Sequence, residues 1–136
     1  MEPSGILETV LYVDDLGAAR KFYGDVLGLE PFVVVEGRHL FYRCGNQVFL
    51  IFDPEATRVP AEGAAIVVPT HGAAGPGHIC FRAEGAEIQR WRDKLEGSGV
   101  EIEADFEWPQ GGRSIYFRDP AGNSLEFAEP RIWGLE

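Results

Sequence analysis

The chain has 136 residues, which is long enough for one compact domain with a hydrophobic core. Its formal net charge of −10 opposes contact with phosphate backbones and anionic lipids, so we expect neither a nucleic-acid nor a membrane partner. The first ten residues lack the basic and apolar regions of a signal peptide, and two cysteines cannot form a disulfide framework, which together predict a cytoplasmic protein.

The first half of the chain predicts a strand, a helix and then three more strands. Residues 5–13 alternate well enough between polar and apolar side chains to form a half-buried strand. The apolar residues of 14–28 recur at intervals of three and four, which predicts a helix with Asp14 or Asp15 as its N-cap. Residues 31–52 contain three apolar runs separated by EGR and CGN, which are typical turn sequences and therefore predict three strands.

The second half repeats this order after a stretch rich in proline, glycine and alanine. We expect residues 54–76 to be a linker, with a brief extended piece at 66–68. A strand at 77–83 and a helix at 84–99 follow, and three apolar runs then predict three more strands up to residue 130.

The repeat defines one α+β domain over residues 1–136, built from two βαβββ modules. Module one covers about 5–53 and module two about 77–130. Each helix would cover one face of its sheet and leave the opposite face free. Two such sheets side by side, curved by their twist, predict a cup. Strand alternation would line this cup with Glu8, Val10, Tyr12, His78, Cys80, Arg82, Ser124 and Glu126.

Three residues of the predicted cup have side chains that bind metals. Glu8 and His78 stand at equivalent points of the first strand of each module, and Glu126 stands in the last strand, where module one has Leu50. Each alone could be an ordinary strand residue, but their agreement in phase and repeat position favours a shared site. Two carboxylates and one imidazole suit a divalent cation such as Zn²⁺, Ni²⁺, Mn²⁺, Fe²⁺ or Co²⁺.

The remaining polar and aromatic candidates have weaker patterns. Glu126 or Glu8 could also act as a catalytic base. His39 and His71 lie beside a turn and in the linker, so we expect both on the surface. Side chains that could orient a substrate at the cup or its rim, although aromatic strand residues often belong to the core, are Tyr12, Arg82, Tyr116 and Trp108.

Three segments together carry a resemblance to a known family: LETVLYVDDLGAARKFYGDVLGLE, GHICFRA and GGRSIYFRDPAGNSLEFAEP. The first resembles the start of the first module of the vicinal oxygen chelate proteins, and the other two resemble the start and the end of their second module. This superfamily includes glyoxalase I, methylmalonyl-CoA epimerase, extradiol dioxygenases, fosfomycin-modifying thiol transferases and metal-free bleomycin-binding proteins. The resemblance covers residues 5–130 and implies a glyoxalase-like cup with metal ligands at Glu8, His78 and Glu126.

The ligand positions of the family indicate which reactions fit. Leu50 stands at the remaining glyoxalase ligand position and cannot bind a metal, whereas one ligand from module one and two from module two is similar to the fosfomycin-modifying enzymes. Glu8 departs from the two histidines of the extradiol enzymes. We therefore expect a metal-dependent, glyoxalase-like lyase, isomerase or transferase, which chelates a small oxygenated or thiol-conjugated substrate. The alternatives are a metal-free ligand-binding or resistance protein of the bleomycin-binding type, or a dioxygenase; a homodimer is expected.

Overall fold

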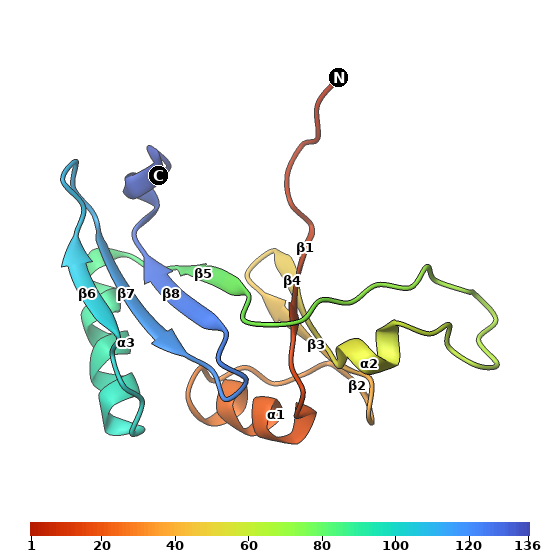
Figure 1. Cartoon of the computed structure of the whole chain (residues 1–136). Helices are drawn as coiled ribbons and strands as arrows, with labels where there is room; N and C mark the ends of the chain where they lie inside the picture. Colours follow the sequence, from red (N-terminus) through yellow and green to blue (C-terminus); the bar gives the residue numbers. More distant parts are fainter. The chain divides into compact units, whose positions relative to one another are not determined.

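The computed structural model describes all 136 residues and divides them into two compact units, Met1–Gly75 (unit one) and Pro76–Glu136 (unit two). Each unit has its own four-stranded mixed sheet, and one longer helix packs on that sheet (Figure 1). This is the α+β fold of two βαβββ modules that the sequence predicts. None of the helices has the length and apolar character needed to span a membrane.

Unit one follows the predicted order of elements. Its sheet has the order β1-β4-β3-β2, in which β1 is parallel to β4 and the other pairs are antiparallel. The elements are β1 (Glu8–Tyr12), α1 (Leu16–Asp25), β2 (Val33–Val35), β3 (His39–Cys44) and β4 (Gln47–Phe52). Asp15 is the N-cap of α1, because its side chain accepts a hydrogen bond from the Ala18 amide at 2.9 Å.

The core of unit one lies between α1 and one face of this sheet. Tyr23 of α1 is fully buried, and its ring centroid lies 5.4 Å from that of Phe49 and 6.2 Å from that of Tyr42. Leu11 and Ile51, which share this face through strand alternation, are also buried. Leu50 points to the opposite face, which carries no helix.

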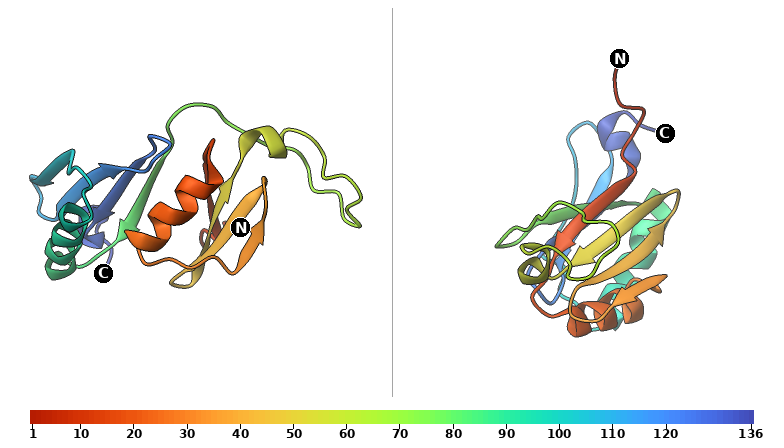
Figure 2. Two further views of the ribbon diagram at one scale, coloured as in Figure 1. Left: turned by 90° about the horizontal axis from the view of Figure 1, so that it is seen from below. Right: turned by 90° about the vertical axis from the view of Figure 1, so that its right-hand side faces the viewer.

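The segment predicted as a linker begins with a short helix, α2 (Pro54–Thr57). The Asp53 side chain accepts from the Glu55 amide at 2.9 Å, and the following proline suits a first helical turn, so the expectation of a plain linker was wrong at this point. The predicted extended piece at 66–68 forms no strand. The His71 amide bonds the Thr57 carbonyl at 3.0 Å and closes a loop, which runs out from the unit-one sheet in Figure 2.

Unit two has the same topology, with the sheet order β5-β8-β7-β6 and β5 parallel to β8. Its elements are β5 (His78–Arg82), α3 (Gly85–Gly97), β6 (Ala104–Glu107), β7 (Arg113–Arg118), β8 (Ser124–Ala128) and a 3₁₀ turn, η1 (Pro130–Trp133). All predicted elements are present, and η1 is the only one that the sequence pattern did not indicate. Ile88 and Leu95 of α3 are fully buried against the sheet.

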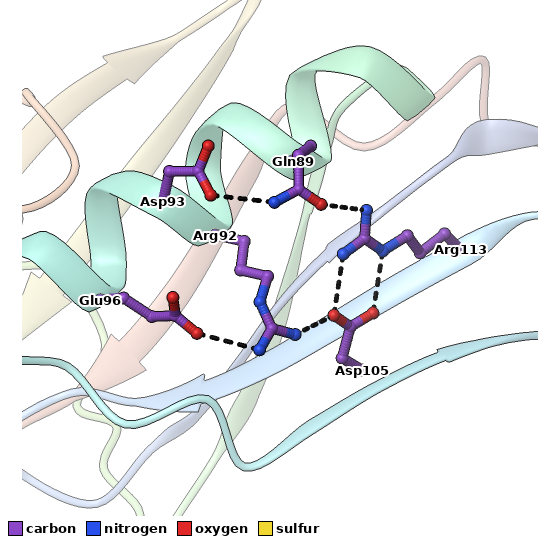
Figure 3. Close-up of polar contacts among 6 residues, drawn as sticks. All are labelled: Gln89, Arg92, Asp93, Glu96, Asp105 and Arg113. Atoms are coloured by element: carbon purple, nitrogen blue, oxygen red, sulfur yellow. Dashed lines mark hydrogen bonds and ion pairs between the residues drawn. The ribbon is translucent and has the colours of Figure 1, made fainter.

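A charged network also attaches α3 to β6 and β7 (Figure 3). Asp105 accepts two hydrogen bonds from Arg113, each of 2.8 Å, and one from Arg92 of the helix. Arg113 donates in addition to Gln89 of α3 at 2.9 Å. The Arg113 hydrogen bonds, supported by Arg92, lower the pKa of Asp105, so this carboxylate stays ionised on the helix side of the sheet.

Candidate functional site

The register of the sheets makes the first-strand candidates equivalent. Glu8 forms the first pair of the β1–β4 ladder, and His78 forms the first pair of the β5–β8 ladder. Leu50 and Glu126 each lie in the third pair of their ladder, and both point away from the helix. The repeat inferred from sequence spacing therefore holds residue by residue in the backbone pairing.

Unit two brings His78 and Glu126 together. The Nε2 atom of His78 lies 3.3 Å from Oε2 of Glu126, and its Nδ1 atom lies 2.9 Å from the Ser124 carbonyl oxygen. A carbonyl only accepts hydrogen bonds, so Nδ1 carries a proton. In the neutral ring, Nε2 then presents its lone pair to the carboxylate. Such a pair is stable when a proton or a metal ion lies between the two atoms.

Glu126, in the middle of β8, is buried, with 5% of its surface exposed. Its Oε1 atom has no hydrogen-bond partner. A buried carboxylate oxygen without a partner is costly, and a bound cation or an acidic proton would remove that cost. The donor set therefore fits a divalent metal ion, although no group of three His, Cys, Asp or Glu side chains is arranged to hold one within unit two.

Cys80 and Tyr116 flank Glu126 on the neighbouring strands of the sheet. Partial burial, followed by the charge of Glu126, raises the pKa of Cys80 to about 12. Partial burial and the same carboxylate raise the pKa of Tyr116 to about 12. At neutral pH the phenol and the thiol therefore keep their protons, so Tyr116 can donate a hydrogen bond to a substrate oxygen, and the exposed Cys80 side chain remains a thiol.

The other predicted site residues lie in varied surroundings. Trp108 donates from Nε1 to the Ser114 hydroxyl at 2.8 Å and is half-buried beside the unit-two sheet. Arg82 is exposed, with Nη2 3.5 Å from a Glu84 carboxylate oxygen. Glu8 is exposed at the start of β1.

Tyr12 belongs to an aromatic cluster on the open face of unit one. The cluster also includes His39 and His71, which the sequence predicted as surface residues. His39 is half-buried, stacks on Phe41 with 4.0 Å between ring centroids, and has a buried Nδ1 atom without a hydrogen-bond partner. Burial, together with the charge of Arg38, lowers the pKa of His39. The surface expectation for His39 was wrong, and the alternation in HLFYRC, which places it beside Phe41 on the face of Leu50, could have corrected it.

The other histidine of unit one is exposed, as expected, but it also contacts this face. The hydroxyl of Tyr12 hydrogen-bonds Nδ1 of His71, and the His71 ring lies edge-on to Phe52 with 4.8 Å between centroids. This contact spans 59 residues of sequence, so no local pattern could have indicated it.

Phe106 is a second residue that sequence reasoning missed. It is 39% exposed, and its ring stacks on that of Tyr116 at 5.8 Å and 14°. Its register opposite Ser114 places it on the same face as Glu126.

Two modules of this topology, with an imidazole and a carboxylate on adjacent parallel strands, define a protein of the glyoxalase-like fold. The model of the Glyoxalase/Bleomycin resistance protein/Dioxygenase superfamily matches residues 5–127. The chain belongs to this superfamily.

Solved structures and a curated relative place the chain within the family. A lactoylglutathione lyase from Agrobacterium tumefaciens is 44% identical, with a TM-score of 0.92 over 99% of this chain and 100% of that one. The fosfomycin resistance protein FosX of Listeria monocytogenes serovar 1/2a is 26% identical over 123 residues, which are 85% of this chain and 82% of FosX. A glyoxalase/bleomycin resistance protein/dioxygenase from Nocardioides, at 22% identity and a TM-score of 0.72 over 95% of this chain and 85% of that one, shares the fold.

Proposed function

We propose that this protein is a divalent-metal-dependent lyase, isomerase or transferase of the glyoxalase type. Its substrate is a small molecule with two neighbouring oxygens, either free or conjugated to a thiol. The observation that carries the proposal is the His78–Glu126 pair, in which Nε2 and Oε2 lie 3.3 Å apart with the Nδ1 proton already committed to Ser124. The likeness to a lactoylglutathione lyase supports a thiol conjugate as the first substrate to test.

Glu8 is the third ligand in this proposal. It occupies in unit one the ladder position that His78 occupies in unit two, and it is exposed and therefore accessible to a metal ion. Leu50 offers no fourth donor, which leaves coordination positions for substrate and water. When bound, the metal would act as a Lewis acid that stabilises negative charge developing on the substrate oxygens.

The chain's own residues supply proton transfer and orientation. The unpartnered Oε1 atom of Glu126 is a proton acceptor close to the proposed substrate position. Glu8 is the second candidate for this role. The phenol of Tyr116, which keeps its proton because of burial and the adjacent carboxylate, can hold a substrate oxygen in place.

Metal content tests the proposal directly. Wild type purified without chelator and reconstituted with Zn²⁺, Ni²⁺, Mn²⁺, Fe²⁺ or Co²⁺ should bind about one ion per chain. We expect His78→Ala and Glu8→Gln each to weaken metal affinity by about 10-fold to 100-fold or more. Arg82→Ala, on the same face as His78 but with no donor for a metal, should leave affinity unchanged. Absence of stoichiometric metal in the reconstituted wild type would contradict the proposal.

Turnover tests the reaction class. The reconstituted protein should interconvert lactoylglutathione with glutathione and its 2-oxoaldehyde, as the name of the Agrobacterium neighbour implies for that protein. Activity should disappear with chelator and return with metal. If metal binds and this substrate is inert, thiol transfer to other small oxygenated substrates becomes the next test of the same site.

A metal-free binding protein is the second candidate, because the open face of unit one is apolar. Leu50 and Phe52 are buried there, and Tyr12, Phe41 and His39 add a continuous set of rings. Such a protein would bind its ligand equally well with and without chelator, so the metal titration separates the two candidates.

A further inference from the structure

An aromatic row leads away from the His78–Glu126 pair on the open face of unit two. The ring of His78 lies 6.2 Å from Tyr116 with 20° between planes, and Tyr116 lies 5.8 Å from Phe106 with 14° between planes. Trp108 closes the row edge-on to Phe106 at 5.0 Å. We call these four residues the aromatic row. Three strands and one turn contribute to it, so its alignment follows from sheet register rather than from sequence proximity.

Phe106 is exposed, whereas Tyr116 and Trp108 of the row are half-buried. Its ring contacts both of them, and 39% of its surface is exposed. Trp108 is fixed by its hydrogen bond to Ser114, which keeps the indole from swinging over Phe106. A large apolar side chain held open beside candidate catalytic residues provides a contact surface for a planar or apolar group.

The charges around the row disfavour an anionic group at this position. Arg118 on the same face bonds Glu103 at 2.7 and 3.0 Å and the Gly122 carbonyl at 3.1 Å. Arg82 lies beside Glu84. Both arginines are therefore paired with carboxylates, so neither offers a free positive charge to an anionic substituent.

From this geometry we infer that Phe106 determines substrate specificity, selecting an uncharged and preferably aromatic substituent next to the two chelating oxygens. This inference rests on the proposed function and adds to it the chemical class of the substrate. The substituent lies against the exposed face of Phe106, while Tyr116 donates to a substrate oxygen beside Glu126. Phe106 alternates with Asp105, which belongs to the network on the helix side, so the Phe106 side chain lies on the open face.

Two small hydroxamates test the inference, because both present the same neighbouring oxygens and differ only in their substituent. Isothermal titration calorimetry on the zinc-reconstituted full chain should show benzohydroxamate binding about tenfold more tightly than acetohydroxamate, as one good ring contact allows. Phe106→Ala should reduce this ratio to about threefold or less, whereas Phe106→Tyr, which keeps the ring, should preserve it. Trp133→Ala is the matched control, because Trp133 is an exposed aromatic residue of unit two outside the row, and its ratio should equal that of wild type.

Failure of the inference and failure of the proposed function give different results. The inference would be overturned if wild type bound the two hydroxamates with equal affinity or bound neither of them. It would also be overturned if Phe106→Ala kept the wild-type ratio of the two affinities. Undiminished binding of both hydroxamates after chelator treatment would instead count against the metal site. The ratio between the two ligands would still report on Phe106 in that case.

Discussion

The two units use one backbone plan for two different open faces. In the third pair of the parallel ladder, unit one places Leu50 and unit two places Glu126. The antiparallel neighbour of that position is Phe41 in unit one and Tyr116 in unit two. At both positions unit one has an apolar side chain and unit two has a side chain that can hold or transfer a proton. The helix side forms the core in each unit, so the open face is where the two copies can differ without loss of the fold.

The helix sides differ in a second way. Helix α1 is held by the buried rings of Tyr23, Tyr42 and Phe49. Helix α3 is held by buried aliphatic residues, by the stack of Trp91 on Phe127 and by the charged network around Asp105. The attachment of α3 therefore depends in part on ionised side chains, in addition to its apolar contacts. Exchanging residues between equivalent positions of the two units tests the difference between the open faces. Neutralising Asp105 tests the difference between the helix attachments.

The largest expected effect comes from making unit two resemble unit one. Glu126→Leu should reduce activity on the metal-dependent substrate by about a thousandfold, because it removes a proposed ligand and proton acceptor together. In metal-free protein the same change should raise the free energy of unfolding by about 1 kcal/mol, since it replaces a buried carboxylate whose Oε1 has no partner. Steady-state kinetics and urea unfolding would measure the two effects.

Glu126→Gln is the matched control for this exchange. It keeps the size of the side chain and removes the charge, so it should lose activity without the gain in stability. Retained activity in Glu126→Leu would show that the carboxylate has no role in the reaction.

Much of the fold follows from local patterns. The alternation of GHICFRA, the three- and four-residue spacing of the first helix, and the turn glycines of EGR and CGN correspond to observed elements, and Gly37 and Gly45 do adopt positive φ values of 70° and 59°. The pairing of His78 with Glu126 was inferred from repeat position, and the parallel register puts these side chains in contact. These features were predictable because strand phase is set by residues close in sequence.

Other features depend on contacts between distant residues. The contact of His71 with Tyr12 arises where the loop after α2 returns to the sheet. Phe106 gains its position from register with Ser114, eight residues away across a turn. Helix α2 was different, because the Asp53–Pro54 pair is a local start signal that the proline- and glycine-rich composition of the segment concealed.

The reverse exchange should have the next largest effect. Leu50→Glu makes unit one resemble unit two, but Leu50 is only 6% exposed and has no polar neighbour in its ladder pair. Burial of this carboxylate should lower the free energy of unfolding by about 3 kcal/mol at pH 7. Leu50→Met, which keeps an apolar side chain of similar volume, should cost less than about 1.5 kcal/mol. Equal stability of the glutamate variant and wild type would mean that the open face of unit one is more accessible to water than its burial indicates.

The smallest of the three effects concerns the charged attachment of α3. Asp105→Asn should lower the free energy of unfolding by about 2 kcal/mol at pH 7, because two arginines lose their shared carboxylate. The Arg113 hydrogen bonds, with Arg92, lower the pKa of Asp105 in the folded protein, so its stabilising contribution is present above the unfolded pKa of roughly 4 and is lost as pH falls through the folded value. The difference between wild type and Asp105→Asn should therefore shrink on acidification below about pH 4.

Urea unfolding at several pH values measures this difference, with Asp93→Asn as the control. Asp93 lies on the same helix and bonds only the Gln89 amide within the network, so its replacement should change stability little at any pH. The attachment of α1 in unit one is instead built on the buried rings of Tyr23, Tyr42 and Phe49. If the stability difference between wild type and Asp105→Asn did not change with pH, the network would act through hydrogen-bond geometry rather than through charge. The attachments of α1 and α3 would then differ in their packing and not in their dependence on ionisation.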